Sequence, residues 1–115
     1  MQKKRFSSPD QVKNLPKTKM EIINVAGSPL VQITYEPGWK WSENIKPTVK
    51  TESCQVHHIL YALSGRLMVV MSGGEKIELT PNDVIDIPPS HDAWVVGSEP
   101  FVALDIAGLS KGHDL

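Results

Sequence analysis

From residue 20 onward, the sequence is a series of short apolar runs, each followed within a few residues by glycine, proline or asparagine. Short runs rich in Val, Ile, Thr and Leu that end at turn residues are typical of all-β domains. Glycine and asparagine adopt positive φ at low cost, and proline lacks the N–H that a strand ladder needs, so these residues mark strand ends. No long amphipathic helix is evident in the pattern. The expected strands are Met20–Val25, Val31–Tyr35, Lys40–Ser42, Cys54–Leu63, Leu67–Met71, Lys76–Leu79, Asp83–Ile87, Ala93–Val96 and Phe101–Ile106.

Two of these strands are apolar on both faces. Ile59–Leu63 and Leu67–Met71 are uninterrupted apolar runs of five residues each. A strand with one face in water alternates between apolar and polar residues, whereas a strand covered on both sides does not. We therefore expect a two-sheet sandwich or barrel, with one outer face covered by a second subunit, rather than an open sheet.

The charges are distributed unevenly along the 115 residues, which fit one domain. The first 20 residues carry six Lys or Arg and one acidic residue, and the rest of the chain carries six and twelve. We predict a basic N-terminal segment over residues 1–19 that is partly mobile or arm-like, a β-barrel domain over 20–108 and a C-terminal tail over 109–115. The basic residues alternate with Ser, Pro, Asn and Gln rather than forming one block, so no nucleic-acid partner is expected.

Neither a membrane nor a secreted location is indicated. The longest apolar runs have five residues, whereas a membrane-spanning helix needs roughly 20. The basic residues Lys3–Arg5 are not followed by an apolar segment before Pro16, as a secretory signal requires. The single cysteine, Cys54, cannot form a disulfide within the chain, which fits a reducing compartment. We expect a soluble cytoplasmic protein without membrane contact.

One cluster of polar residues lies within the predicted strand Cys54–Leu63 and just before it. Alternate side chains of a strand share a face, so Glu52, Cys54, His58 and Leu60 are expected on one face. His57 is expected on the opposite face. The adjacent histidines therefore cannot both point into one cavity without a bulge.

A second polar cluster follows a proline-rich corner. His91 and Ala93 are expected on one face of the next strand, and Asp92 and Trp94 on the other. A thiolate with two imidazoles suits zinc, iron or nickel, and a neighbouring carboxylate can complete or orient such a site. A partly buried cysteine and hydrogen-bonded histidines without metal are the alternative on the residues alone.

Three polar residues near the turns have simpler interpretations. Asp83 is expected to cap the corner in which it lies, through side-chain hydrogen bonds to the backbone. Asp86 lies between two isoleucines and should face solvent or an interface. Arg66 could bind an anion, but a surface ion pair is the commoner role of an arginine in an exposed turn.

The stretch "SGRLMVVMSGGEKIELTPNDVIDIPPSHDAWVV" resembles the conserved half of the cupin family. Ser64-Gly65-Arg66 matches the turn after the family's first motif, Asn82-Asp83-Val84 its Gly-Asp-Val corner, and Pro88-Pro89-Ser90 its Pro-x-Gly. The resemblance implies an all-β fold, a double-stranded β-helix (jelly-roll) barrel with an extended N-terminal segment. It also implies that the chain forms a homodimer, as many cupins do.

The resemblance also implies a metal site with unusual ligands. Counting back from the first-motif turn, Glu52 and Cys54 occupy the family's two histidine positions and His58 occupies its glutamate position. Ala93 falls where the second-motif histidine is expected, and His91 lies two residues earlier on the same predicted face. The implied ligands of a divalent zinc, iron or nickel ion are therefore Cys54, His58, His91 and Glu52.

The same barrel implies a small-molecule pocket lined by Trp41, Leu60, Ala93 and Trp94. The two tryptophans could stack on a planar or sugar ring, although packing is the commoner role of a tryptophan. Cupins include dioxygenases, isomerases, sugar-binding regulators and storage proteins, so the fold does not fix a reaction. We expect a small cupin with a metal site and a small-molecule ligand, and a dioxygenase or isomerase type if it is an enzyme. A non-catalytic binding or sensing module without metal is the alternative.

Overall fold

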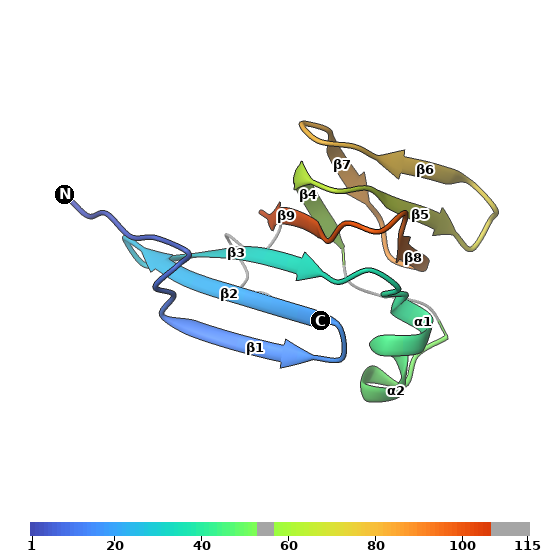
Figure 1. The fold of residues 1–115 in the computed structure, drawn as a ribbon, viewed down its shortest axis with the longest axis horizontal. Helices are drawn as coiled ribbons and strands as arrows, with labels where there is room; N and C mark the ends of the chain where they lie inside the picture. The colour runs from blue at the N-terminus through green and yellow to red at the C-terminus, as the bar shows by residue number, and fades with distance from the viewer. Residues whose placement is uncertain (53–56, 107–115) are drawn as a thin grey trace.

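The computed structural model describes residues 1–52 and 57–106. Its strands form two antiparallel sheets, one of six strands in the order β1-β2-β3-β9-β4-β7 and one of three in the order β6-β5-β8 (Figure 1). The elements are β1 (Gln11–Leu15), β2 (Thr18–Val25), β3 (Ser28–Tyr35), α1 (Trp41–Asn44), α2 (Lys46–Val49), β4 (His58–Ser64), β5 (Leu67–Met71), β6 (Lys76–Leu79), β7 (Val84–Ile87), β8 (His91–Val95) and β9 (Phe101–Asp105). The predicted all-β class is confirmed.

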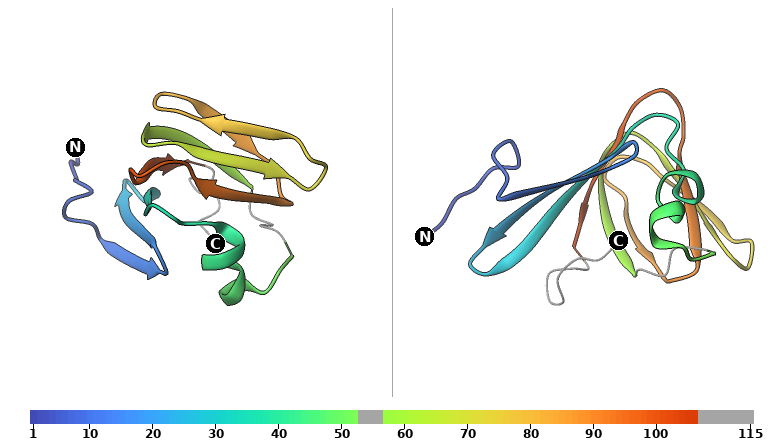
Figure 2. Two further views of the ribbon diagram at one scale, coloured as in Figure 1. Left: turned by 45° about the vertical axis from the view of Figure 1, so that its right-hand side comes forward. Right: turned by 90° about the horizontal axis from the view of Figure 1, so that it is seen from below.

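The two sheets pack face to face at one end of the molecule. The three-stranded sheet lies over β4, β7 and β9, whereas the blue strands β1 and β2 extend away from it (Figures 1 and 2). The hairpin partner β1 lies within the basic segment 1–19 and pairs with β2 from Gln11↔Ile22 to Leu15↔Thr18. The space between the sheets is therefore bounded mainly by β3, β9 and β4 on one side and by β5 and β8 on the other.

The core follows the strand alternation. Met20, Ile33, Ala103 and Ala62 are cross-strand neighbours from β2 to β4, and each is at most 2% exposed. The facing sheet contributes the buried side chains of β5, β6 and β8, namely Leu67, Val69, Leu79, Ala93 and Val95. Where the two sheets face each other, their inner faces are thus removed from water, as a two-sheet barrel requires.

The strand predicted over Lys40–Ser42 was wrong. Lys40 makes only an isolated bridge to Trp94, and the chain then turns into α1. Two side-chain acceptors fix this turn, because the Lys40 N–H donates to Asn44 Oδ1 at 2.8 Å and the Ser42 N–H donates to Asp92 Oδ1 at 3.1 Å. The second of these contacts spans 50 positions, so the local sequence does not reveal it.

The turn between β4 and β5 requires glycine. Gly65 has φ +78°, and a Cβ at this position would lie 2.2 Å from the Pro100 carbonyl oxygen. The Ser64-Gly65-Arg66 turn therefore packs directly against the start of β9.

Among the described residues, no helix is long and apolar enough to cross a membrane.

Asp83 caps the turn that leads into β7, as predicted. Its Oδ2 accepts hydrogen bonds from the Thr80 N–H at 2.8 Å and from the Thr80 hydroxyl at 2.9 Å. Both bonds favour the ionised carboxylate and therefore lower the pKa of Asp83 below its usual value. The bond from the Thr80 N–H has the larger effect, and the bond from the hydroxyl has the smaller one. Asn82 supplies the positive φ of 76° that this corner needs.

Candidate functional site: two buried histidines between the sheets

A buried histidine–aspartate pair lies on the inner face of the six-stranded sheet. His58 is the first residue of β4, and Asp105 is the last residue of β9, the strand beside it. His58 Nδ1 lies 2.7 Å from Asp105 Oδ2, and the two residues are 8% and 1% exposed. A carboxylate buried in this way is an acceptor, so it holds the imidazole with its Nδ1 proton directed at Oδ2.

The second histidine comes from the opposite sheet. His91 opens β8, is 4% exposed, and its Nδ1 lies 2.8 Å from the Pro88 carbonyl oxygen. A carbonyl can only accept, so Nδ1 donates and the lone pair of the neutral ring is at Nε2. The His58 and His91 rings meet edge to face, with centroids 5.4 Å apart and planes at 69°.

Both histidines line a small cavity with a mostly apolar wall. Its volume is about 20 Å³, enough for about one water molecule or ion. Tyr35 and Trp39 stack in this wall with ring centroids 3.8 Å apart, and Trp39 Nε1 donates to Thr18 Oγ1 at 2.8 Å. The remaining lining residues are Trp41, Leu60, Leu67, Ile87 and Ala93.

The comparisons with solved structures find similar proteins, whereas two comparisons of the sequence find none. No protein-family model matches it, and no curated protein matches it either. A protein of unknown function (DUF1255) from Acidithiobacillus ferrooxidans is 21% identical, with a TM-score of 0.64 over 86% of this chain and 88% of that one. KdgF from a Halomonas species is 19% identical, with a TM-score of 0.57 over 83% and 82%.

A third solved structure decides the fold type. A cupin-like protein from Thermotoga maritima is 19% identical, with a TM-score of 0.52 over 76% of this chain and 65% of that one. This chain has a cupin fold. The resemblance drawn from the "SGR", "NDV" and "PPS" stretches is confirmed for the architecture.

The cupin barrel brings together only part of the predicted ligand set. His58 and His91 meet at the cavity, whereas Cys54 lies outside the described residues. The Glu52 side chain is 98% exposed and pairs with Lys46 at 3.3 Å, so it points into solvent. The alternation used to place Glu52 does not extend to it, because β4 begins only at His58.

The predicted pocket residues also separate. Trp41, Leu60 and Ala93 line the cavity in the cupin barrel. Trp94 lies on the other face of β8, with the Lys40 ammonium 5.5 Å and the Lys76 ammonium 5.9 Å from its ring centroid. This tryptophan is therefore half-buried under two lysines and does not line the cavity.

Asp105 is the residue that sequence reasoning missed. It follows Phe101 and Ala103 at the inward positions of β9, where a carboxylate interrupts an otherwise apolar series. A buried acidic residue is uncommon unless it has a partner. This interruption was the available signal, but the sequence does not say that the partner is His58, 47 positions away.

The chemistry of the two histidines fits a metal in part. Histidines that bind metals usually donate their other ring N–H to a carboxylate or a backbone carbonyl, and Asp105 and Pro88 provide these acceptors for His58 and His91. Within residues 1–52 and 57–106, however, no group of three or more His, Cys, Asp or Glu side chains is arranged to hold a metal ion. The described part of the cupin barrel therefore supplies two imidazoles.

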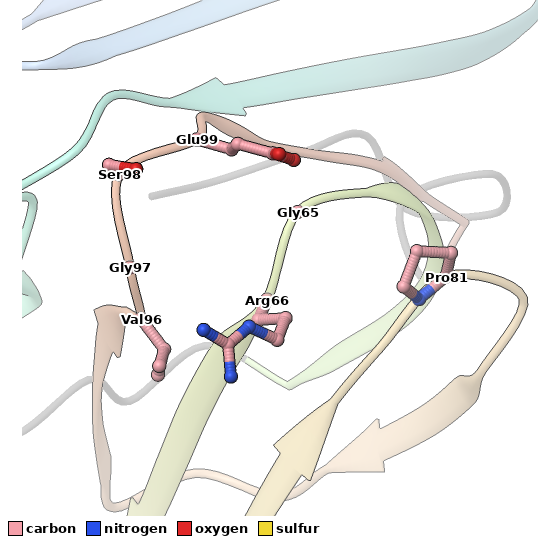
Figure 3. Close-up of a pocket in the computed structure, with 7 residues that line it drawn as sticks. All are labelled: Gly65, Arg66, Pro81, Val96, Gly97, Ser98 and Glu99. Atoms are coloured by element: carbon pink, nitrogen blue, oxygen red, sulfur yellow. The ribbon is translucent and has the colours of Figure 1, made fainter.

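A second cavity lies at the turns of the cupin barrel, away from the histidines. It has a volume of about 300 Å³ and is lined by Gly65, Arg66, Pro81, Val96, Gly97, Ser98 and Glu99 (Figure 3). Arg66 makes the expected surface ion pair, with Glu78 at 3.3 Å. Because Glu78 and Glu99 offset the single guanidinium, this cavity lacks the positive charge that would attract an anion.

Proposed function

We propose that the cavity between His58 and His91 is the functional site, and that it binds a divalent metal ion. The observation that carries this proposal is the shared arrangement of the two imidazoles. Each is buried, and each has its Nδ1 bonded to an acceptor, Asp105 for His58 and the Pro88 carbonyl for His91. The two acceptors fix the ring orientation of histidines that come from facing sheets.

Zinc, iron and nickel all accept imidazole, and a thiolate from Cys54 would add a softer ligand. Such a metal supplies a Lewis acid or a redox centre when bound. In this proposal Asp105 keeps the His58 ring in one orientation. Tyr35, Trp39 and Trp41 form an aromatic wall beside the same space.

Ligand binding without metal is the second candidate, and a different observation favours it. The cavity wall is mostly aromatic and aliphatic, and the described residues contain no group of three potential ligands. Pockets with such walls bind small organic molecules through apolar contact with a few oriented polar groups, and a cavity of about 20 Å³ must widen to admit one. In this case a ligand would raise the melting temperature of the metal-free protein, and no turnover would accompany binding.

Metal content tests the proposal directly. Untagged protein purified without added metal should contain about one equivalent by elemental analysis, and His91→Ala should lose it. His57→Ala is the matched control, because His57 is adjacent to His58 in sequence but lies on the exposed face with Asp86. Retention of metal by His57→Ala and its loss from His91→Ala supports the site. Protein that contains no metal, and takes up none when zinc, iron or nickel is added, contradicts it and favours the metal-free module.

A further inference from the structure

Three turns meet at one end of the cupin barrel and enclose the cavity that contains Arg66, which we call the turn cavity. Gly65 and Arg66 follow β4, Pro81 lies between β6 and β7, and residues 96–99 lie between β8 and β9 (Figure 3). Its volume of about 300 Å³ is at the lower end of the range of small-molecule pockets. The cavity between the two histidines has a volume of about 20 Å³, so the turn cavity has more room for a small organic molecule.

Backbone contacts hold the walls of the turn cavity in place. The Val96 N–H donates to the Arg66 carbonyl oxygen at 3.0 Å, which joins the turn after β4 to the turn before β9. Gly65 packs against Pro100 in the same region. The Asn82 N–H donates to the backbone of β4 at 2.9 Å, which holds the turn between β6 and β7. Binding to walls that are fixed in this way requires little ordering of the protein.

The Arg66 guanidinium supplies the positive charge of the turn cavity. Its Nη2 lies against Gly97, since a Cβ at residue 97 would be 3.0 Å from this nitrogen. Among the described residues it donates only to Glu78, at 3.3 Å, and both side chains of this pair are partly exposed, so the pair is weak. A guanidinium has five N–H donors in a fork that matches the two oxygens of a carboxylate. Arg66 can therefore bind a carboxylate of a ligand.

Glu99 supplies a negative charge at a different point of the same wall. It is exposed and lines the cavity next to Ser98. Within residues 1–52 and 57–106, its carboxylate makes no ion pair or hydrogen bond, and Arg66 pairs with Glu78 instead. Figure 3 shows Arg66 and Glu99 on separate turns around the cavity. The wall thus carries a cation and an anion that do not pair with each other.

We propose that the turn cavity binds a small zwitterion of the amino-acid class, with the ligand carboxylate on Arg66 and the ligand ammonium on Glu99. A simple anion would be repelled by Glu99 and Glu78, and a simple cation would be repelled by Arg66. A zwitterion carries both charges and meets an opposite charge at each end. The Ser98 hydroxyl, beside Glu99, can accept a hydrogen bond from the ammonium. Because exposed ion pairs are weak, the dissociation constant should be in the millimolar range.

NMR titration of the isotope-labelled full chain with ω-amino acids tests this site. The probes are glycine, β-alanine, γ-aminobutyrate and ε-aminocaproate, in which the distance between the carboxylate and the ammonium increases stepwise. The turns fix the positions from which Arg66 and Glu99 extend, so one member of the series should bind best. Its binding should shift the amide signals of Gly97 and Ser98, which lie in the cavity wall.

Glu99→Gln removes the group that binds the ammonium. It should raise the dissociation constant of the best amino acid by about fivefold, which corresponds to the loss of one exposed ion pair. Glu75→Gln is the matched control, because Glu75 is also exposed but lies at the opposite end of β5 from Arg66. It should leave the dissociation constant within about twofold of the wild-type value.

Butyrate, butylamine and glycerol distinguish a zwitterion site from other kinds of site. Butyrate and butylamine each carry one of the two charges, and glycerol carries hydroxyl groups without charge, so all three should bind more weakly than the best amino acid. The proposal is overturned if any of them binds as tightly, or if no amino acid shifts the Gly97 and Ser98 signals. Equal effects of Glu99→Gln and Glu75→Gln also overturn it. None of these results depends on whether the cavity between the histidines holds a metal.

Discussion

His57 and His58 are adjacent in sequence, and each contacts an aspartate, yet the two pairs lie in opposite environments. His57 pairs with Asp86 across the outer face, where the side chains are 52% and 68% exposed. His58 pairs with Asp105 between the sheets, where the side chains are 11% and 0% exposed. The strand pleat alone separates them. A histidine and an aspartate therefore form an exposed contact at one position and a buried contact at the next.

The two pairs should contribute differently to the free energy of unfolding. Exposed ion pairs contribute about 0–1 kcal/mol, because water and salt screen them and two side chains lose freedom. Removal of one partner of a buried pair costs about 3–5 kcal/mol, because the other partner is left buried without its hydrogen bond. The His58 pair should therefore dominate stability, whereas the His57 pair should be almost dispensable.

Asp105→Ala is the sharpest test of this difference. We expect a loss of about 3–5 kcal/mol in the free energy of unfolding, measured by urea denaturation, because the His58 ring loses its buried acceptor. Asp86→Ala should cost less than about 1 kcal/mol. Asp105→Asn keeps an oxygen acceptor, so its loss should fall between these values. Equal losses for the two alanine variants would mean that burial does not distinguish the pairs.

Leucines on the two faces of β4 extend the comparison to apolar side chains. Leu60 is 3% exposed on the inner face, and Leu63 is 39% exposed near the bulge at the end of the strand. Leu60→Ala should destabilise the monomer by about 2–5 kcal/mol, because it leaves a cavity beside His58. Leu63→Ala should cost less than about 1 kcal/mol under the same denaturant conditions at low protein concentration. Similar costs would contradict the assignment of the two faces.

The strand pattern was predictable where local composition decides it. β5 and β6 were predicted with their observed bounds, Leu67–Met71 and Lys76–Leu79, because each is a short run between glycine or proline turns. The opposite orientation of His57 and His58 also followed from the period of two along a strand. The cupin architecture was predictable from its turns, above all from Gly65, whose lack of a side chain is needed against Pro100.

The site was only partly predictable, because its contacts join distant segments. The alternation placed His58 and His91 on inner faces, but no local pattern identifies Asp105 as the acceptor of His58, 47 positions earlier. A strand was predicted over Lys40–Ser42, whereas Asp92, 50 positions after Ser42, helps to hold a helical turn there. Burial of a polar group depends on the partner that satisfies it, and that partner is set by the tertiary fold.

The smallest expected effect concerns a third aspartate, Asp83, which is exposed like Asp86 but is hydrogen-bonded to Thr80. These bonds lower the pKa of Asp83 below its usual value of 3.8. A carboxyl group with a lowered pKa in the folded state stabilises the fold above its unfolded pKa, and this contribution is lost as the pH falls through the folded value. The Asp83→Asn variant should therefore be less stable than the wild type by a constant amount near neutral pH. This difference in stability should become smaller below about pH 4. Asp86→Asn is the control, and thermal melts between acidic and neutral pH measure both. A difference for Asp83→Asn that is independent of pH would show that the Thr80 contact does not favour the charged carboxylate.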